Sequence, residues 1–187
     1  LVHTLTLLSP TGLGREPHRN HVSPIAEQLL LKMPWSHALF QLLCSRPSIR
    51  YFLAKSFIGP IDEGLQAYCY ETAHQPGAEY APWAFISGRF AVPEVFDRVY
   101  AELRTPTLIL YDKDAYTSFD RLGELMLRNQ WIRSIRVPHT CGLPQWDSTR
   151  LTCALLTHHL QMVRRLSPQA IHGYGWEHRE SDVQLLH

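Results

Sequence analysis

The sequence predicts an α/β fold with a parallel sheet, and two observations lead to this prediction. Three stretches have the composition of strands: 2–8, 107–111 and 131–137. Helical patterns separate and follow them, and strands that alternate with helices are typical of parallel sheets with crossover connections. Residues 13–104 are too many for one crossover, so we expect them to form an inserted helical region.

Composition fits a folded domain and excludes several classes of partner. The 187 residues are 45% hydrophobic, and 18 Lys+Arg oppose 17 Asp+Glu, for a net charge of +1 without any basic run. We therefore expect no nucleic-acid partner. No apolar run approaches the roughly 20 residues that a membrane-spanning helix needs, so no transmembrane segment is predicted.

The first half of the chain predicts one strand and several short helices. The alternating stretch Val2–Leu8 is rich in β-formers and ends at the turn residues 9–12. Seven prolines, from Pro24 to Pro93, then divide the sequence up to Leu103, and each excludes a long uninterrupted helix. The clearest helix is Ile61–His74, which has apolar residues along one face. Pro93 opens the next helix, whose apolar stripe ends at Leu103.

The second half predicts two further strands with helices between and after them. Thr107–Tyr111 is almost wholly apolar, as in strands covered on both faces. A helix is expected from Phe119 to Arg128, a strand from Trp131 to Val137, and a long helix from Ser148 to Leu166. His159 falls on the apolar side of that last helix and is expected to be a packed core residue.

Cysteine and histidine spacing does not indicate a metal site. The four cysteines include no CxxC pair, so we expect neither zinc nor a disulfide framework, and we predict buried or inert thiols. His18 and His21 could bind a metal only with a third ligand, and none is near in sequence. No cofactor is predicted.

The order of these elements, with Thr105–Tyr111 followed by acidic residues, resembles the α/β-hydrolase fold after its nucleophile. Three stretches resemble cyanobacterial and chloroplast α/β-hydrolases most closely: 45–53, 73–78 and 142–144. This resemblance covers residues 1–165. It implies a hydrolase core of about three parallel strands from residues 1–12 and 105–166, a helical lid at 13–104 and a C-terminal tail at 167–187.

In this fold the catalytic serine, acid and histidine follow one another along the chain. No G-x-S-x-G elbow occurs, since Ser87-Gly88 has no glycine two residues before the serine, and the resemblance places the elbow before Leu1. Asp114 matches the acid position best and Asp112 second. Alternatively, both aspartates only cap a helix or a turn.

The histidine position has two candidates. The related proteins read Gly-Leu-Pro-His in the loop after the last strand, and here Gln145 follows Gly142–Pro144. A glutamine amide does not titrate near neutral pH and cannot replace the imidazole as a base. His139, which follows the same predicted strand, is the alternative base.

These residues predict a non-catalytic protein that acts as a structural or interaction subunit of a larger assembly. A half-sheet would leave one edge uncovered, and such an edge needs a partner chain. The tail 167–187 is expected to contact a partner. The alternative is a serine hydrolase of ester or acyl substrates whose nucleophile-bearing half lies outside this chain. The resemblance also implies a chloroplast location and a photosynthetic membrane complex as the host.

Overall fold

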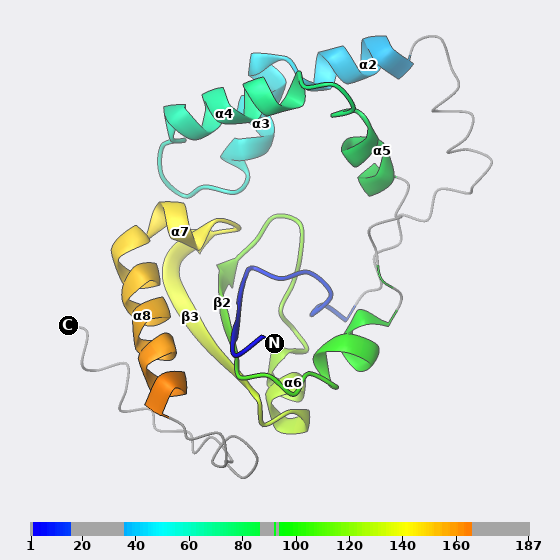
Figure 1. Ribbon diagram of the computed structural model, residues 1–187. Helices are drawn as coiled ribbons and strands as arrows, with labels where there is room; N and C mark the ends of the chain where they lie inside the picture. Colours follow the sequence, from blue (N-terminus) through cyan, green and yellow to red (C-terminus); the bar gives the residue numbers. More distant parts are fainter. Residues whose placement is uncertain (1, 16–35, 87–91, 93, 166–187) are drawn as a thin grey trace.

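The computed structural model describes residues 2–15, 36–86, 92 and 94–165. The part that it describes begins with a strand, continues through a series of helices, and ends with two strands and their helices (Figure 1). In chain order the elements are β1 (Leu5–Leu8), α2 (Ser36–Leu43), α3 (Arg46–Ala54), α4 (Glu63–Ala73), α5 (Tyr80–Ile86), the π-helix η1 (Phe96–Tyr100), β2 (Thr107–Lys113), α6 (Leu122–Arg128), β3 (Ile132–Cys141), α7 (Pro144–Asp147) and α8 (Thr149–Arg165).

The sheet is parallel and has the order β1-β2-β3, which confirms the predicted fold class. Pairing starts at Leu5 opposite Thr107, so β1 is shorter than the predicted strand from Val2. The third strand is longer than predicted, because it continues past Val137 to Cys141. The register of the two strands shifts between Tyr111 and Lys113, and beyond the shift Cys141 pairs with Lys113.

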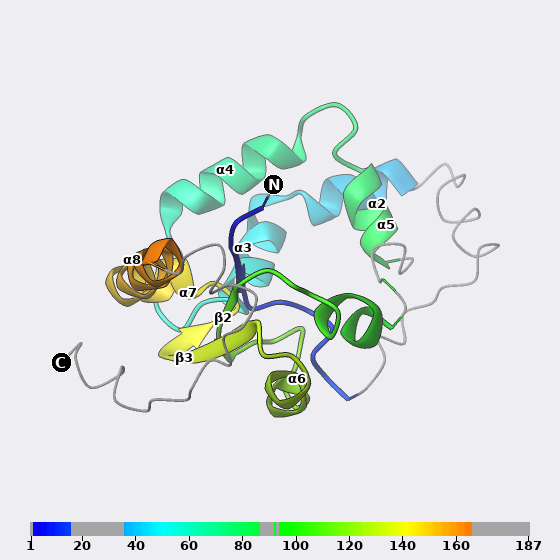
Figure 2. The ribbon, with the colours of Figure 1, turned by 60° about the horizontal axis from the view of Figure 1, so that its bottom comes forward.

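Alternate residues of β2 fill two cores, one on each face of the sheet. Leu108 and Leu110 pack with Leu155 of α8, while Ile109 packs with Leu125 of α6. Figure 2 shows α8 and α6 apart, with β2 and β3 between them. Burial on both faces explains why this strand has no polar alternation.

Helices α2–α5, residues 36–86, form what we call the helical region, which lies beyond the carboxyl ends of the strands (Figure 1). It has a small core of its own around Phe40, Cys44 and Trp83. The N-caps of α3 and α4 are Ser45 and Asp62, whose side chains accept hydrogen bonds from backbone N–H groups. Neither α3 nor α4 contains a buried residue.

The predicted helices are found with changed boundaries. The helices expected at 61–74 and 148–166 are α4 and α8, and the one expected from Phe119 begins only at Leu122. The helix expected from Pro93 to Leu103 is instead the π-helix η1, which ends at Tyr100. The amide of Asn129 donates to the carbonyl oxygens of residues 100, 101 and 103, so these carbonyls have partners without a further helical turn.

Gly12 fixes how the loop after β1 packs on η1. Its φ of 85° lies in the left-handed region, and a Cβ there would overlap Val95. The hydroxyl of Tyr100 donates to Thr11 O at 2.8 Å. In the described part of the chain, no helix is long and apolar enough to cross a membrane.

Candidate functional site

The loops after β2 and β3 meet at the carboxyl end of the sheet, where ligands commonly bind in α/β folds. Three carboxylates lie there: Asp112, Asp114 and Asp147. Each has different hydrogen-bond partners, and these partners determine which of the three is available for chemistry.

Asp112 holds the end of β3 in place. Its side chain is only 3% exposed, and Oδ1 accepts from Arg136 Nε at 2.6 Å. Oδ2 accepts from Thr140 N at 3.2 Å, beside the register shift. The hydrogen bond to Asp112 raises the pKa of Arg136. Asp112, the second candidate acid, is therefore paired with Arg136 and stabilises the backbone at the register shift.

Asp114 lies next to the loop that follows β3. Oδ1 accepts from Tyr116 N at 2.7 Å, which is the turn-stabilising role considered as the alternative. Oδ2 faces Gly142, where an added Cβ would lie 3.2 Å from it. Ser56 from the helical region lies against the same glycine, with its Oγ 3.4 Å from that Cβ position. The carboxylate thus faces a residue without a side chain.

His139 lies within β3 and not after it, which corrects the predicted position. It has a φ of 60°, unusual for a residue other than glycine, and its side chain is exposed. Among the described residues, no histidine donates a hydrogen bond to Asp112 or Asp114.

Gln145 lies at the start of α7, in the loop after β3 where the resemblance implies a histidine. Its Oε1 is buried and has no hydrogen-bond partner in the described structure. A buried amide oxygen without a donor is uncommon and costs free energy. The side-chain oxygen is therefore enclosed by the protein, and the described structure shows no hydrogen bond between Gln145 and either candidate acid.

Asp147 is a site residue to which the sequence assigned no role. Its carboxylate accepts from Cys141 N at 2.9 Å, from Ile58 N at 3.2 Å and from Gly59 N at 3.5 Å. It therefore joins the end of β3 to the helical region. The sequence did contain one indication of this role, because Asp147 is an acid in the first turn of a helix that Pro144 opens.

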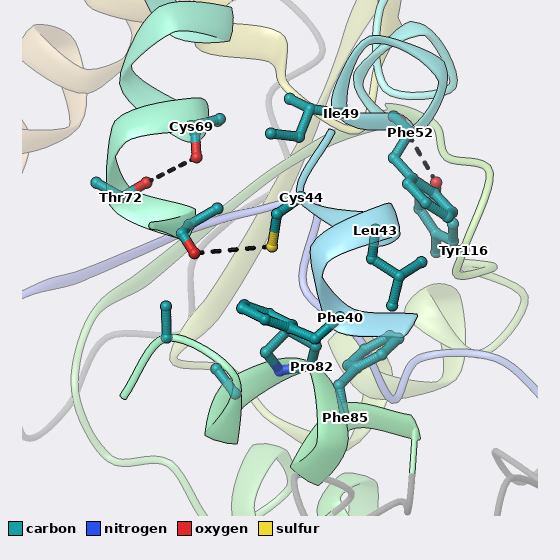
Figure 3. Close-up of a pocket in the computed structure, with 13 residues that line it drawn as sticks. Phe40, Leu43, Cys44, Ile49, Phe52, Cys69, Thr72, Pro82, Phe85 and Tyr116 are labelled. Atoms are coloured by element: carbon teal, nitrogen blue, oxygen red, sulfur yellow. Dashed lines mark hydrogen bonds between the residues drawn. The ribbon is translucent and has the colours of Figure 1, made fainter. Parts of the chain in front are cut away.

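The helical region contains an apolar cavity of about 690 Å³, within the range of small-molecule sites (Figure 3). Three of its polar side chains already make hydrogen bonds within the protein. Thr72 donates to backbone carbonyls of its own helix, the Cys44 thiol to Ala73 O, and the Tyr116 hydroxyl to Phe52 O. Tyr116 also connects the cavity to the loop of Asp114. The lining residues are Phe40, Leu43, Cys44, Ile49, Phe52, Cys69, Thr72, Ala73, Ala78, Ala81, Pro82, Phe85 and Tyr116.

All four cysteines are free. Burial raises the pKa values of Cys44, Cys69 and Cys141, as expected for unreactive thiols, whereas Cys153 is exposed on α8. Within the described ranges, no group of three His, Cys, Asp or Glu residues could hold a metal ion. The His18/His21 pair, the Ser87-Gly88 pair and the tail 167–187 lie outside the described residues.

Several solved structures to which the chain is similar are hydrolases. The chain is similar to a membrane phospholipase A, a bacterial virulence factor, with TM-score 0.58, 19% identity, and 88% of this chain and 50% of that chain covered. It is also similar to the serine hydrolase CarC, involved in carbazole degradation, with TM-score 0.58, 14% identity, and 87% of this chain and 55% of that chain covered. A third similar structure is a thermophilic esterase from Thermogutta terrifontis, with TM-score 0.52, 14% identity, and 86% of this chain and 56% of that chain covered.

These similarities show the fold of the C-terminal part of an α/β-hydrolase sheet with a large helical insertion. The chain spans about half the length of the structures that it matches. No protein-family model and no curated protein sequence matches it.

Proposed function

We propose that this protein is a non-catalytic α/β-hydrolase-fold protein that acts as a structural or interaction subunit of a larger protein assembly. The observation that carries the proposal is the environment of Asp114. Its carboxylate lies against Gly142, which Ser56 also contacts, and its only hydrogen bond in the described structure is to a backbone N–H. An acid in a triad orients an imidazole and stabilises its cation, which requires direct contact between the two side chains.

The free edge of β1 supports an interaction role. Leu5 N–H donates to Pro106 O, just before β2, and Ser9 N–H donates to Leu110 O within β2. Because backbone groups alternate in direction along a strand, the amides of Thr6 and Leu8 point to the other edge, where the described structure has no strand. An unpaired edge of a short apolar strand favours pairing with a strand of another chain.

Replacing Thr6 by proline tests this edge. Thr6→Pro removes an N–H that β2 does not use, and the preceding Leu5 is already extended, as proline requires. We expect the unmodified chain to self-associate through β1, and Thr6→Pro to lower the associated fraction several-fold in sedimentation velocity. Thr6→Val, which keeps the N–H, is the control. Equal association of all three proteins would contradict the role of this edge.

The alternative is a serine hydrolase of ester or acyl substrates whose nucleophile-bearing half lies outside this chain. The cavity favours it, because an apolar space of about 690 Å³ that borders Tyr116, two residues from Asp114, suits an acyl chain. In that case His139 would have to act as the base.

A fluorophosphonate probe, which reacts with activated serines, separates the two functions. Incubated with the longest natural form of the protein, it should leave no covalent adduct by intact-mass spectrometry if the protein is non-catalytic. Stoichiometric labelling that His139→Ala abolishes would instead establish the hydrolase. Labelling that survives this substitution would also overturn the non-catalytic proposal.

Three further parts of the proposal depend on the sequence resemblance. These are a location in the chloroplast, membership of a photosynthetic membrane complex, and the division into a core (1–12 and 105–166), a lid (13–104) and a tail (167–187). A gentle purification of the tagged full-length protein, followed by mass spectrometry of what copurifies, tests the second of them.

A further inference from the structure

One short segment makes the described polar contacts between the helical region and the sheet. We call residues 52–59 the docking segment. Phe52 O accepts from the Tyr116 hydroxyl at 3.4 Å, and Lys55 O accepts from Cys141 Sγ at 3.2 Å. The backbone N–H groups of residues 58 and 59 donate to Asp147. These hydrogen bonds connect residues on opposite sides of the contact, 52–59 on the helical region and 116, 141 and 147 on the sheet side.

The docking segment also positions two helices. It contains the last turn of α3 and leads into α4, and the N–H of Ile58 lies between them in sequence. Phe57 is 9% exposed, whereas its neighbour Ile58 is 53% exposed. A displacement of this segment must therefore move α3 and α4 together, along with the cavity that they line.

Asp147 is the strongest link in this contact. One carboxylate accepts N–H groups from both sides, Cys141 on the sheet and Ile58 and Gly59 on the docking segment. Hydrogen bonds to an ionised acceptor are stronger than those between neutral groups. The other two links are a thiol and a long hydroxyl contact, which contribute less.

We propose that Asp147 is the positioning residue that holds the helical region over the carboxyl end of the sheet, so that Asp114 and Gly142 lie covered. Ser56, in the middle of the docking segment, is the residue that lies against Gly142. Release of Asp147 would lift Ser56 from this position and expose the loop of Asp114. This role does not depend on whether the site is catalytic.

Hydrogen exchange of the full chain, followed by mass spectrometry, tests this role in Asp147→Asn, Asp147→Glu and a control. The asparagine retains size but loses the charge and one acceptor oxygen. We expect about tenfold faster exchange of residues 112–119, which make no hydrogen bond to Asp147, with α6 and α8 unchanged. Asp147→Glu keeps the charge and should show a smaller increase. Glu102→Gln is the matched control, because Glu102 is an exposed carboxylate that pairs with none of the described residues.

Two results would overturn the proposal. The first is faster exchange confined to the amides of Ile58, Gly59 and Cys141, which would show loss of the hydrogen bonds without displacement of the segment. The second is the same acceleration of residues 112–119 in Glu102→Gln, which would assign the effect to charge alone.

Discussion

The sheet and the helical region are stabilised in different ways. In the sheet, Leu108, Ile109 and Leu110 are at most 2% exposed, and helices cover them on both faces. In the helical region, α3 and α4 have no buried residue, and the helices surround a cavity of about 690 Å³. Apolar burial thus fixes the sheet, whereas we propose that the hydrogen bonds of one segment fix the position of the helices. The position of the helical region can therefore change at a much lower free-energy cost than the packing of the sheet.

The largest expected effect compares one leucine from each region. Leu110→Ala removes a fully buried side chain from a filled core and should lower the free energy of unfolding by about 2–5 kcal/mol. Leu43→Ala removes a half-buried side chain that already faces the cavity, so the loss should be about 1 kcal/mol or less. Urea unfolding monitored by circular dichroism measures both. Equal losses would mean that the helical region is packed as tightly as the sheet.

A smaller effect is expected at His159, which stabilises the sheet at its amino end. The Thr4 hydroxyl donates to Pro106 O, so the Nε2–H of His159 donates to Thr4 Oγ1, at 2.7 Å. The imidazole is 3% exposed, which confirms it as a packed core residue. Burial lowers its pKa, and the positive charges of Arg133 and His158 lower it further.

The lowered pKa of His159 predicts a loss of stability in acid. As the pH falls through about 6.5, the unfolded chain takes up a proton at His159 that the folded protein binds only at lower pH, so the free energy of unfolding decreases. His159→Gln can still donate to Thr4 but does not titrate. Its urea midpoint should therefore fall less than that of the unmodified protein between about pH 7.5 and about pH 5.5. Parallel decreases in the two proteins would exclude His159 as the acid-sensitive group.

Local sequence patterns were sufficient to predict the sheet. The apolar run at 107–111 marks β2 because residues covered on both faces cannot alternate with polar ones. Strand ends were harder to predict, because they depend on the partner strand. β1 begins at Leu5 only because β2 begins opposite it at Thr107. The π-helix could not be predicted, because Asn129, distant in sequence, binds the carbonyls at its end.

The candidate site was predicted in part. The rule that the carboxyl ends of parallel strands lie together places Asp112 and Asp114 correctly at one edge. Their roles depend on partners that spacing does not reveal, such as Arg136 for Asp112. Asp147 was missed because its donors at 58 and 59 are 89 and 88 positions away along the chain. Whether Gln145 or His139 stands at the inherited histidine position stays a prediction.

Leu5–Leu8 pair with Thr107–Leu110, so the residues between these two strands form one loop that the strand pairing closes. The entropy lost on closing a loop increases only with the logarithm of its length, by about 0.6 kcal/mol for each doubling. Insertions or deletions within the helical region, residues 36–86, should therefore change the stability of the strand pairing very little. The helical insertion is free to vary in length and shape while β1 and β2 keep the same register.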